Sequence, residues 1–364
     1  MSSYRSFRDL DWGLLAIALT ICAIGIMQIY SATHEIPIWA NAWWKQVLYV
    51  AFGLVLMWFI ASIDYHTLLG QIPIIYITTV VLLIVVLLFG KSIGGARRWI
   101  QMPGLLLQVS EFAKLMIILL VARFLTELRR DTLEVRELLK LGMLVAVPWL
   151  LVKREPDLGT ALTYLPVFGI GVFLAGLRAR YIVISVILLV GISWVSFHHV
   201  LEDYQRARIE SFLNPELDPR GSGYQVVQSK IAIGSGGMWG RGVTQGSQTQ
   251  LRFLPVPHTD FVFATFGEEH GFVGVVVVLI LYFWLLMQIV QNAQTAPDRA
   301  GMYICMGVAA LLLFHLLVNV GMVVGLMPVT GIPLPLMSSG GSNMLSTFLM
   351  LGLVNNVRLR RFVN

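Results

Sequence analysis

The sequence predicts an all-α, polytopic integral membrane protein with about ten transmembrane helices and one long extracytoplasmic loop. Hydrophobic residues make up 57% of the 364 residues and charged residues only 13%, whereas a soluble domain usually carries about twice that share of charge. Apolar runs reach roughly 20 residues, the length that crosses about 30 Å of hydrocarbon. The runs are continuous rather than alternating, which excludes a membrane β-barrel and leaves helices as the spanning elements.

Ten apolar segments give the expected spans. They lie near residues 13–31, 43–61, 74–90, 111–126, 138–152, 159–177, 181–199, 262–288, 303–326 and 343–357. The fifth and the last are short, so we expect tilt or local thinning of the bilayer there. Residues 200–261 form the long loop between spans seven and eight. Because no soluble domain or linker interrupts the chain, residues 1–364 are expected to form one membrane domain.

Lysine and arginine predict the orientation, because short cytoplasmic loops carry an excess of them. With both termini inside, the inner segments hold thirteen, namely Arg5, Arg8, Arg123, Arg129, Arg130, Arg136, Lys140, Arg178, Arg180, Arg299, Arg358, Arg360 and Arg361. The short outer loops hold six, namely Lys45, Lys91, Arg97, Arg98, Lys153 and Arg154. Both termini are therefore expected in the cytoplasm. The six outer cations suit an anionic substrate and, equally, lipid phosphates.

The formal net charge of +6 does not indicate a nucleic-acid partner. In a membrane protein, basic residues gather in cytoplasmic loops and at lipid headgroups, which accounts for the excess. Membrane lipids are therefore expected as anionic neighbours, and no nucleic acid is expected to bind.

The charge pattern of the long loop singles out Asp260. Residues 200–218 mix both signs, whereas the charged residues after Asp218 are all basic until Asp260, at the head of the eighth span. A basic stretch that ends in one carboxylate suits a phosphate-bearing substrate with a single base beside it. The alternative is an interfacial loop anchored by its basic residues. Asp260 could be that base, or a helix N-cap that contributes about 1 kcal/mol.

Two features next to Asp260 are open to more than one interpretation. Residues 234–240 are rich in glycine, which lets backbone N–H groups approach phosphate oxygens, but no Lys-Ser/Thr follows as in a nucleotide-binding loop. A flexible turn explains the segment equally well. Glu268 and Glu269 lie inside the eighth span. Since charge is costly at that depth, they are expected to face a cavity or a partner.

Two more clusters lie at the expected outer ends of spans. Glu111 and Lys114 are three residues apart, so they share a helix face and can pair. A lysine at this position could equally hold a phosphate. Asp157 follows Glu155 and is placed to cap the sixth span. Together with Asp260, these two carboxylates could also form a divalent-metal site of oxygen ligands.

The last cluster is residues 331–343, GIPLPLMSSGGSN. Its two prolines and its small residues cannot form a smooth helix. Such backbone at the edge of a membrane must line a cavity or pack against protein. The histidines, by contrast, show no spacing typical of a metal site.

These features occur in the same order in one family, the SEDS proteins (shape, elongation, division and sporulation), which the chain resembles over almost its whole length. The matching segments are 110–114, 154–160, 212–215, 228–237, 254–269, 319–326 and 331–343. Residues 246–251 and 253–255 resemble the elongation branch, RodA, more than the division branch, FtsW. Two departures concern the lip of the site, since Val256-Pro257 replaces the usual Glu-Arg or Glu-Ala, and Ser339 replaces a common Tyr.

The resemblance implies a peptidoglycan glycosyltransferase in the bacterial cytoplasmic (inner) membrane. It would polymerise lipid II into β-1,4 glycan strands at the outer leaflet during cell elongation and rod-shape maintenance. The catalytic aspartate of the family matches Asp260, and other site residues of the family match Glu111, Lys114 and Asp157. The remaining candidates for substrate binding are Arg206, Arg208, Lys230, Ser338, Ser339 and Gly340.

The chemistry of this reaction requires only one base. Pyrophosphate is a good leaving group once its charge is neutralised, so the second carboxylate of a glycosidase is not needed. Asp260 would take the proton from the 4-hydroxyl of the acceptor, and polyprenyl pyrophosphate would leave with inversion. Arg206, Arg208 and Lys114, with Mg²⁺ or another divalent cation, would stabilise the leaving group. No organic cofactor is expected.

The family also implies partners and alternatives. The expected partners are lipid II, the growing lipid-linked glycan, a class B penicillin-binding protein transpeptidase and other proteins of the elongation complex. A lipid II flippase would need the same ligand but would place its decisive charges near the midplane. Here they gather toward the outer face, which favours chemistry there. A scaffold that only activates the transpeptidase is a third possibility.

Overall fold

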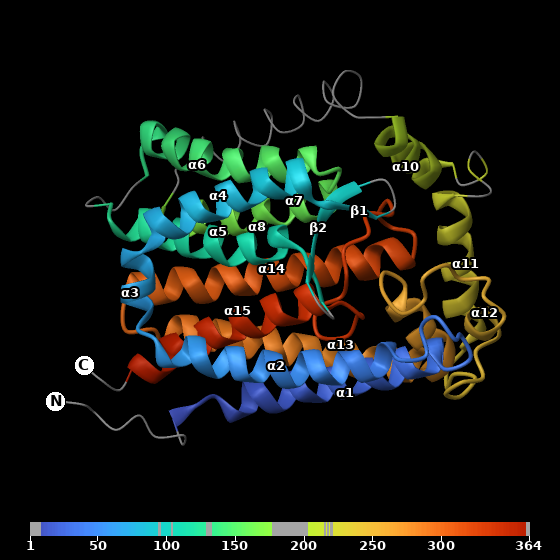
Figure 1. Cartoon of the computed structure of the whole chain (residues 1–364). Coiled ribbons are helices and arrows are strands. Elements are labelled where there is room, and N and C mark those ends of the chain that lie inside the picture. Colours follow the sequence, from blue (N-terminus) through green and yellow to red (C-terminus); the bar gives the residue numbers. More distant parts are fainter. Residues whose placement is uncertain are drawn as a thin grey trace.

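The computed structural model describes residues 9–93, 96–102, 105–128, 133–176, 203–214, 216, 218 and 221–361. Its elements are α1 (Trp12–Thr33), α2 (Ala42–Ser62), α3 (Tyr65–Gly70), α4 (Ile72–Phe89), β1 (Lys91–Ile93), β2 (Ala96–Met102), β3 (Leu105–Leu107), α5 (Val109–Thr126), α6 (Val135–Arg154), α7 (Leu158–Leu162), α8 (Tyr164–Leu174), α10 (Asp203–Leu213), α11 (Ser222–Ser235), α12 (Ser247–Gln250), α13 (Val262–Gln294), α14 (Arg299–Val323) and α15 (Gly341–Arg360). The long helices run side by side, and α10, α11 and α12 gather at one end of them (Figure 1). The expected seventh span, 181–199, lies outside the described residues.

The helical membrane architecture is confirmed. Among the described helices, α1, α2, α4, α13 and α14 are long and apolar enough to cross a bilayer, and α7 with α8 forms a shorter apolar stretch. The expected shortness of the fifth and last spans is wrong, because α6 and α15 each have 20 residues. Polar residues at the ends of these helices hid their full length. In α15 these include Ser342 and Arg360, which are buried within the bundle.

Small residues let the backbones of α2 and α15 approach each other. A Cβ atom at Gly352 would lie 2.8 Å from the carbonyl oxygen of Met57, and one at Gly53 would lie 2.5 Å from the ring of Phe348. Helices in a bilayer associate through this kind of close packing, since lipid offers little hydrophobic drive between them. α15 thereby becomes a central element of the bundle.

The glycine-rich segment 234–240 packs against a kink in α13. Gly271 has φ 65° inside this helix, which interrupts the helical hydrogen bonds. The segment replaces them, because Phe272 N–H donates to the Gly237 carbonyl at 2.8 Å and Arg241 N–H donates to the Glu268 carbonyl at 3.0 Å. A Cβ atom at Gly240 would lie 2.1 Å from the Glu269 carbonyl oxygen. The turn interpretation is therefore the correct one.

The carboxylates of Glu268 and Glu269 bind protein groups. The Glu268 carboxylate accepts hydrogen bonds from the N–H groups of Gln248 and Thr249 at 2.7 and 3.1 Å, at the start of α12. The Glu269 carboxylate accepts from Gln28 Nε2 and the Ser31 hydroxyl of α1. Of the two expectations, a cavity or a partner, the structure shows protein partners. Glu268 fixes the long loop to α13, and Glu269 joins α13 to α1.

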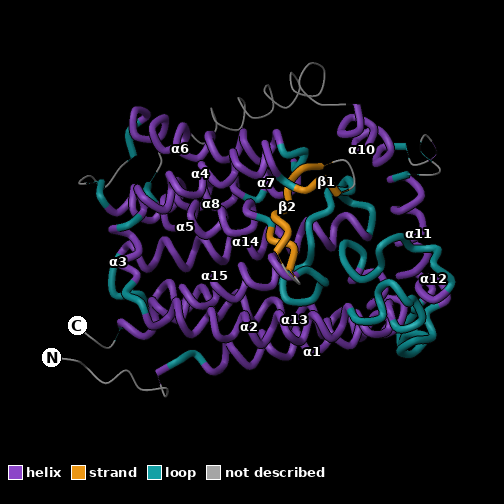
Figure 2. The backbone as a smooth tube through the Cα atoms, viewed as in Figure 1, coloured by secondary structure: helices purple, strands orange, loops and turns teal. Residues whose placement is uncertain are grey.

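Residues 91–93, 96–102 and 105–107 form a small antiparallel sheet that the sequence did not predict. The strand order is β1-β2-β3, with Lys91 opposite Trp99 and Gln101 opposite Leu106. Figure 2 shows the strands between the helices and the loop segments of the α10–α12 end. The register between β1 and β2 shifts between Lys91 and Ser92, which leaves Arg98 of β2 as an extra residue in a bulge. Trp99 and Gln101 are two residues apart and lie on one face of the strand.

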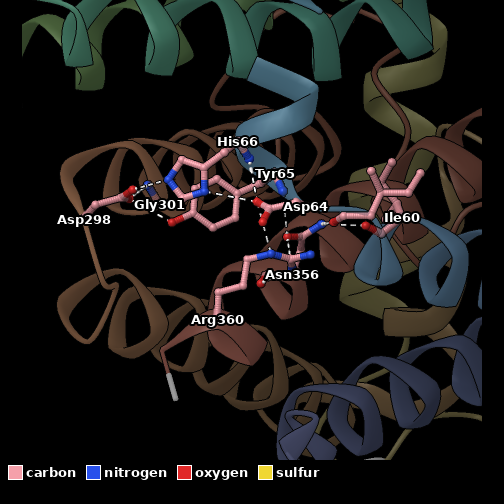
Figure 3. Close-up of polar contacts among 9 residues, drawn as sticks. Ile60, Asp64, Tyr65, His66, Asp298, Gly301, Asn356 and Arg360 are labelled. Atoms are coloured by element: carbon pink, nitrogen blue, oxygen red, sulfur yellow. Dashed lines mark hydrogen bonds and ion pairs between the residues drawn. The ribbon is translucent and has the colours of Figure 1, made fainter. Parts of the chain in front are cut away.

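At the opposite end of the bundle, the start of α1 meets the end of α15. Arg358 Nη1 lies 2.9 Å from Asp11 Oδ2, and the same aspartate caps α1 by accepting from Leu14 N–H at 3.1 Å. A second polar cluster, made by Asp64, Tyr65, His66, Asp298 and Arg360, joins α3, α14 and α15 at this end (Figure 3). We call these five residues the terminal cluster.

Candidate functional site

Two cavities meet at Asp260. The first, which we call the α10 cavity, has a volume of about 260 Å³ and lies between α10, α7 and residues 328–331. The second, which we call the central cavity, has a volume of about 270 Å³ and lies between the sheet, α5 and residues 339–343. Four residues line both, namely Arg98, Asp157, Asp260 and Gly331. Asp260 therefore forms part of the wall between two spaces that could each hold part of a substrate.

The Asp260 carboxylate is unpaired within the described part of the chain. The N-cap of α13 is Phe261, and no side chain caps this helix, so the N-cap alternative for Asp260 is wrong. Its carboxylate makes no hydrogen bond or ion pair with any described residue. The backbone is nevertheless fixed, because Asn319 Nδ2 donates to the Asp260 carbonyl at 3.0 Å and to the Ile332 carbonyl at 2.8 Å. A fixed backbone with an unpaired carboxylate suits a general base.

The surroundings of Asp260 act on its pKa in both directions. Burial of the carboxyl raises its pKa, and nearby Asp157 adds to this, whereas the guanidinium groups of Arg208 and Arg98 lower it. The net direction is upward. A base with a pKa closer to neutrality takes a proton more readily in the transition state.

The segment 331–340 is bonded to the segment that carries Asp260. The Ser338 hydroxyl donates to the Thr259 carbonyl at 2.7 Å and accepts from Leu334 N–H at 2.8 Å. Ser338 is fully buried, lines neither cavity and holds the two segments together through these hydrogen bonds. Ser339 and Gly340 do line the central cavity.

His258 lies two residues before Asp260 and is neutral near pH 7. Burial lowers its pKa to about 4, and its ring packs on Trp39 with 4.5 Å between the ring centroids. Its carbonyl oxygen accepts from Ser339 N–H at 2.9 Å. His258 therefore helps to hold the two segments together and supplies no positive charge to the site.

Asp157 caps a helix, as the sequence predicts, and also reaches both cavities. Its Oδ1 accepts from Thr160 N–H at 3.2 Å at the start of α7 and lies 3.5 Å from Arg98 Nη1. Its Oδ2 accepts from Gln108 Nε2 at 2.6 Å. With both oxygens engaged, Asp157 orients Arg98 at the boundary between the cavities.

The carboxylates do not fit the expected metal site. Among the described residues, no group of three or more His, Cys, Asp and Glu side chains could hold a metal ion. Asp157 is already bonded to Arg98 and Gln108. Glu155 is 0% exposed, lines neither cavity and has no described partner for either carboxylate oxygen. Its burial, with the charge of Asp157, raises its pKa to about 8. We therefore assign no metal-ligand role to Glu155, Asp157 and Asp260.

Glu111 and Lys114 form the ion pair that their spacing predicts. Lys114 Nζ lies 2.7 Å from Glu111 Oε1 and 3.2 Å from His315 Nε2. The Ser346 hydroxyl donates to Glu111 Oε2 at 3.2 Å. Glu111 lines the central cavity, but Lys114 is only 1% exposed and lines neither cavity. Lys114 therefore pairs with Glu111 from behind the cavity wall, and its role toward a substrate phosphate stays a prediction.

The cations of the site come from two separate elements. On α10, the residues Gln205, Arg208 and Ile209 face the α10 cavity, as expected for positions i, i+3 and i+4 of a helix. Arg206 lies between them and does not line it. Arg98 comes from β2 and lines both cavities.

The basic stretch of the long loop is not the source of this charge. Lys230 packs over Gly325, where a Cβ atom would lie 2.0 Å from its Cε. Arg241 Nε donates to the Ser235 carbonyl at 3.1 Å. Neither these residues nor Arg252 line the two cavities, and Arg220 lies outside the described residues. Lys230 and Arg206 are therefore not placed where a substrate in these cavities would touch them.

Sequence reasoning missed several residues of the site. The sequence pattern does not single out Gln108, Gln205 and Asn319, and it marks Arg98 only as one of six outer cations. Asn319 belongs to a segment that matches the SEDS pattern, which was a usable signal. Gln205 gave none, because a glutamine in a mixed-charge segment is unremarkable without knowledge of what α10 faces.

The chain is similar to known proteins over almost its whole length. The family model for FtsW, RodA and SpoVE, described as Cell cycle protein, matches residues 11–361. The chain is 38% identical to the Escherichia coli (strain K12) protein named Peptidoglycan glycosyltransferase MrdB, over 97% of this chain and 94% of that one. It is 33% identical to the Treponema pallidum protein named Peptidoglycan glycosyltransferase RodA, over 98% and 99% of the two chains.

Solved structures are similar as well. A chain from a study of polymerization and crosslinking by a peptidoglycan synthase complex matches with a TM-score of 0.84 and 34% identity, over 98% of this chain and 99% of that one. The Rod shape determining protein RodA of Thermus thermophilus matches with a TM-score of 0.73 and 30% identity, over 97% and 98% of the two chains. The fold and the sequence thus point to the same set of relatives.

Proposed function

The chain belongs to the FtsW, RodA and SpoVE family, and from this premise we propose that it is a peptidoglycan glycosyltransferase. It polymerises lipid II into β-1,4 glycan strands during cell elongation. Two relatives named as peptidoglycan glycosyltransferases match almost the whole chain and support this proposal. The observation that carries it is the carboxylate of Asp260, which no described residue pairs and which lies where the two cavities meet.

Asp260 acts as the general base of an inverting displacement. It accepts the proton of the acceptor 4-hydroxyl while that oxygen forms a bond to the anomeric carbon of the donor. The bond from this carbon to the pyrophosphate oxygen breaks, and the electron pair leaves with polyprenyl pyrophosphate. Asp260 then releases the proton to water. General-base assistance of this kind contributes about 10²–10⁴ in rate.

Arg98 and Arg208 stabilise the departing pyrophosphate. Both line the α10 cavity together with Asp260, and both act on its carboxyl pKa, so they are close enough to neutralise charge that develops beside it. Mg²⁺ or another divalent cation would have to be brought by the pyrophosphate oxygens, since the described residues offer no complete set of ligands. No step is therefore assigned to a metal.

The proposed setting is the bacterial cytoplasmic membrane, with both termini in the cytoplasm and the site facing outward. The contact of Arg358 with Asp11 supports the two chain ends lying on one side of the membrane. A class B penicillin-binding protein transpeptidase is the proposed partner. The similarity to a chain from a peptidoglycan synthase complex supports it.

The test is glycan synthesis by the purified chain in proteoliposomes, with lipid II as the only substrate and the transpeptidase partner present. The unaltered chain should make glycan polymer, and Asp260→Ala should lose it while keeping its thermal stability. Polymerisation that persists in Asp260→Ala would refute the base assignment.

Two added measurements separate the other functions. Polymerisation by the isolated chain, without the transpeptidase, distinguishes an enzyme from a scaffold. Transfer of labelled lipid II across the bilayer, measured for the unaltered chain and for Asp260→Ala, tests the flippase. Transfer that survives the substitution while no polymer is ever formed would favour a transporter.

A further inference from the structure

A third cavity opens beside the site and is not used by the mechanism above. It has a volume of about 490 Å³ and lies between the start of α2 and the sheet. We call it the α2 cavity. It shares Trp99, Ser339, Gly340 and Gly341 with the central cavity. The three cavities thus form a row, with the central cavity in the middle and Asp260 at its boundary with the α10 cavity.

The α2 cavity differs from the other two in its charge. Its described lining includes Lys45 and Lys91 and no acidic residue, whereas Asp157 and Asp260 line both other cavities. Lys91 Nζ donates to Gln101 Oε1 at 2.8 Å, and Lys45 makes no ion pair with a described residue. Two lysines without a carboxylate beside them are suited to a phosphate group.

Aromatic side chains line the same cavity. Trp39, Tyr49 and Trp99 are half-buried there, and flat aromatic rings pack against the apolar faces of sugars while their polar atoms stay wet. Because Lys91 lies opposite Trp99, and Gln101 opposite Leu106, in the sheet, all four side chains project from one face of it. The lining therefore suits a ligand that joins sugar rings to a phosphate.

The α2 cavity is fixed to the loop of the site. Gln46 follows Lys45 on α2 and is buried. Its Nε2 donates to the Ser338 carbonyl at 3.0 Å, and its Oε1 accepts from Gly340 N–H at 3.3 Å. The position of Lys45 is thereby set relative to the loop that lines the central cavity.

We propose that the α2 cavity is the acceptor subsite, in which Lys45 and Lys91 bind the pyrophosphate of the incoming lipid II and its disaccharide extends through the central cavity to Asp260. This inference rests on the proposed glycosyltransferase function. The assignment follows from the direction in which each substrate must lie relative to Asp260. In the acceptor, the attacking 4-hydroxyl and the pyrophosphate are at opposite ends of the disaccharide, so its pyrophosphate must lie away from the base.

The donor has the opposite requirement. Its pyrophosphate is attached to the reacting carbon and must lie close to Asp260, where Arg98 and Arg208 line the α10 cavity. The carboxylate-free α2 cavity, on the far side of the central cavity, matches the distant pyrophosphate of the acceptor. Arg98 is thus a donor contact, and Lys45 and Lys91 are acceptor contacts.

The experiment measures the initial rate of polymerisation against lipid II concentration in proteoliposomes that contain the transpeptidase partner. The double variant Lys45→Ala, Lys91→Ala should raise the apparent KM for lipid II by about tenfold or more, because charge-assisted hydrogen bonds are lost, and should change kcat little. Lys45→Arg with Lys91→Arg should keep the KM low. Arg154→Ala, an exposed outer cation that lines none of the three cavities, is the matched control.

Each outcome decides one question. If the unaltered chain makes no polymer, the proposed function fails, whatever the variants do. If it makes polymer and the double alanine variant has the KM of Arg154→Ala, the acceptor assignment is wrong. The assay is repeated in vesicles of zwitterionic lipid alone and with phosphatidylglycerol added. A KM difference that exists only with the anionic lipid would show that the lysines bind bilayer headgroups, and would also overturn the assignment.

Discussion

The two ends of the helical bundle use the same residue types in opposite ways. In the terminal cluster, Asp298 accepts from the Tyr65 hydroxyl at 3.0 Å, from His66 Nε2 at 2.6 Å and from Gly301 N–H at 2.7 Å (Figure 3). At the other end, the Asp260 carboxylate has no such donor among the described residues. An aspartate surrounded by donors joins helices, whereas an unpaired aspartate beside a cavity remains able to take a proton.

The two ends also differ in whether their polar residues line a cavity. Among the described residues, no member of the terminal cluster lines the three cavities, whereas Asp260 lines two of them. Buried polar groups whose hydrogen bonds are all made stabilise the fold. Polar groups beside a cavity lack some of these bonds, which lowers stability but leaves room for a substrate. The comparison therefore predicts that substitutions at one end change the reaction and substitutions at the other change folding.

The largest expected effect is seen when an aspartate is replaced by asparagine at each end and the two variants are compared. Asp260→Asn should lower polymerisation by about 10²–10⁴ and leave thermal stability nearly unchanged, because no described hydrogen bond is lost. Asp298→Asn should keep polymerisation but lower stability by about 1 kcal/mol, since Tyr65 and His66 would then donate to a neutral amide oxygen in place of a charged carboxylate. Polymerisation rate and thermal unfolding, measured on both variants, check this. A similar loss of activity in both would remove the distinction.

The next effect concerns the buried ion pair of Glu111 and Lys114 beside the central cavity. Lys114→Met should destabilise the protein by about 3–5 kcal/mol, because it leaves the Glu111 carboxylate buried without its cation. Thermal unfolding in detergent measures the change. The control is the double variant Glu111→Gln, Lys114→Met, which removes both charges and should recover part of the stability. If the single variant is as stable as the unaltered chain, water in the central cavity solvates the Glu111 carboxylate well enough without Lys114.

Glu155 should make stability depend on pH. Its pKa is raised from 4.5 to about 8 in the folded chain, so the folded state binds the proton more tightly than the unfolded state. Stability should be greatest below about pH 4.5 and fall as the pH rises toward 8. The loss amounts to a few kcal/mol, since each pKa unit corresponds to about 1.4 kcal/mol. Unfolding measured from pH 5 to 9 should show this slope in the unaltered chain and not in Glu155→Gln.

The smallest effect is expected at the exposed edge of the terminal cluster. Asp64 lies 3.2 Å from Arg360 Nε, but its side chain is 46% exposed. Ion pairs in such positions contribute about 0–1 kcal/mol. Asp64→Asn should therefore change thermal stability by less than Asp298→Asn does and leave polymerisation intact. A larger loss at Asp64 than at Asp298 would show that the ion pair with Arg360, rather than the hydrogen bonds to Asp298, holds this end together.

The sequence determined the features that depend on neighbouring residues. Continuous apolar runs predicted the helical spans, since a bilayer admits few other structures. The three-residue spacing of Glu111 and Lys114 predicted their ion pair, and the position of Asp157 predicted its cap of α7. Asp260 was identified from the charge pattern and the SEDS resemblance, but its neighbours could not settle whether it caps a helix or acts as a base.

Only the tertiary structure decided which distant residues meet. Arg98 on β2 and Arg208 on α10 are more than a hundred residues apart in the sequence, and the fold brings both to Asp260. Ser338 and Lys114 were expected to contact substrate. In the folded chain the Ser338 hydroxyl bonds to the Thr259 carbonyl and Lys114 pairs with Glu111. The physical reason is that a side chain's spacing along one helix fixes its nearest neighbours. Whether it then faces a cavity or the protein interior depends on how separate elements pack.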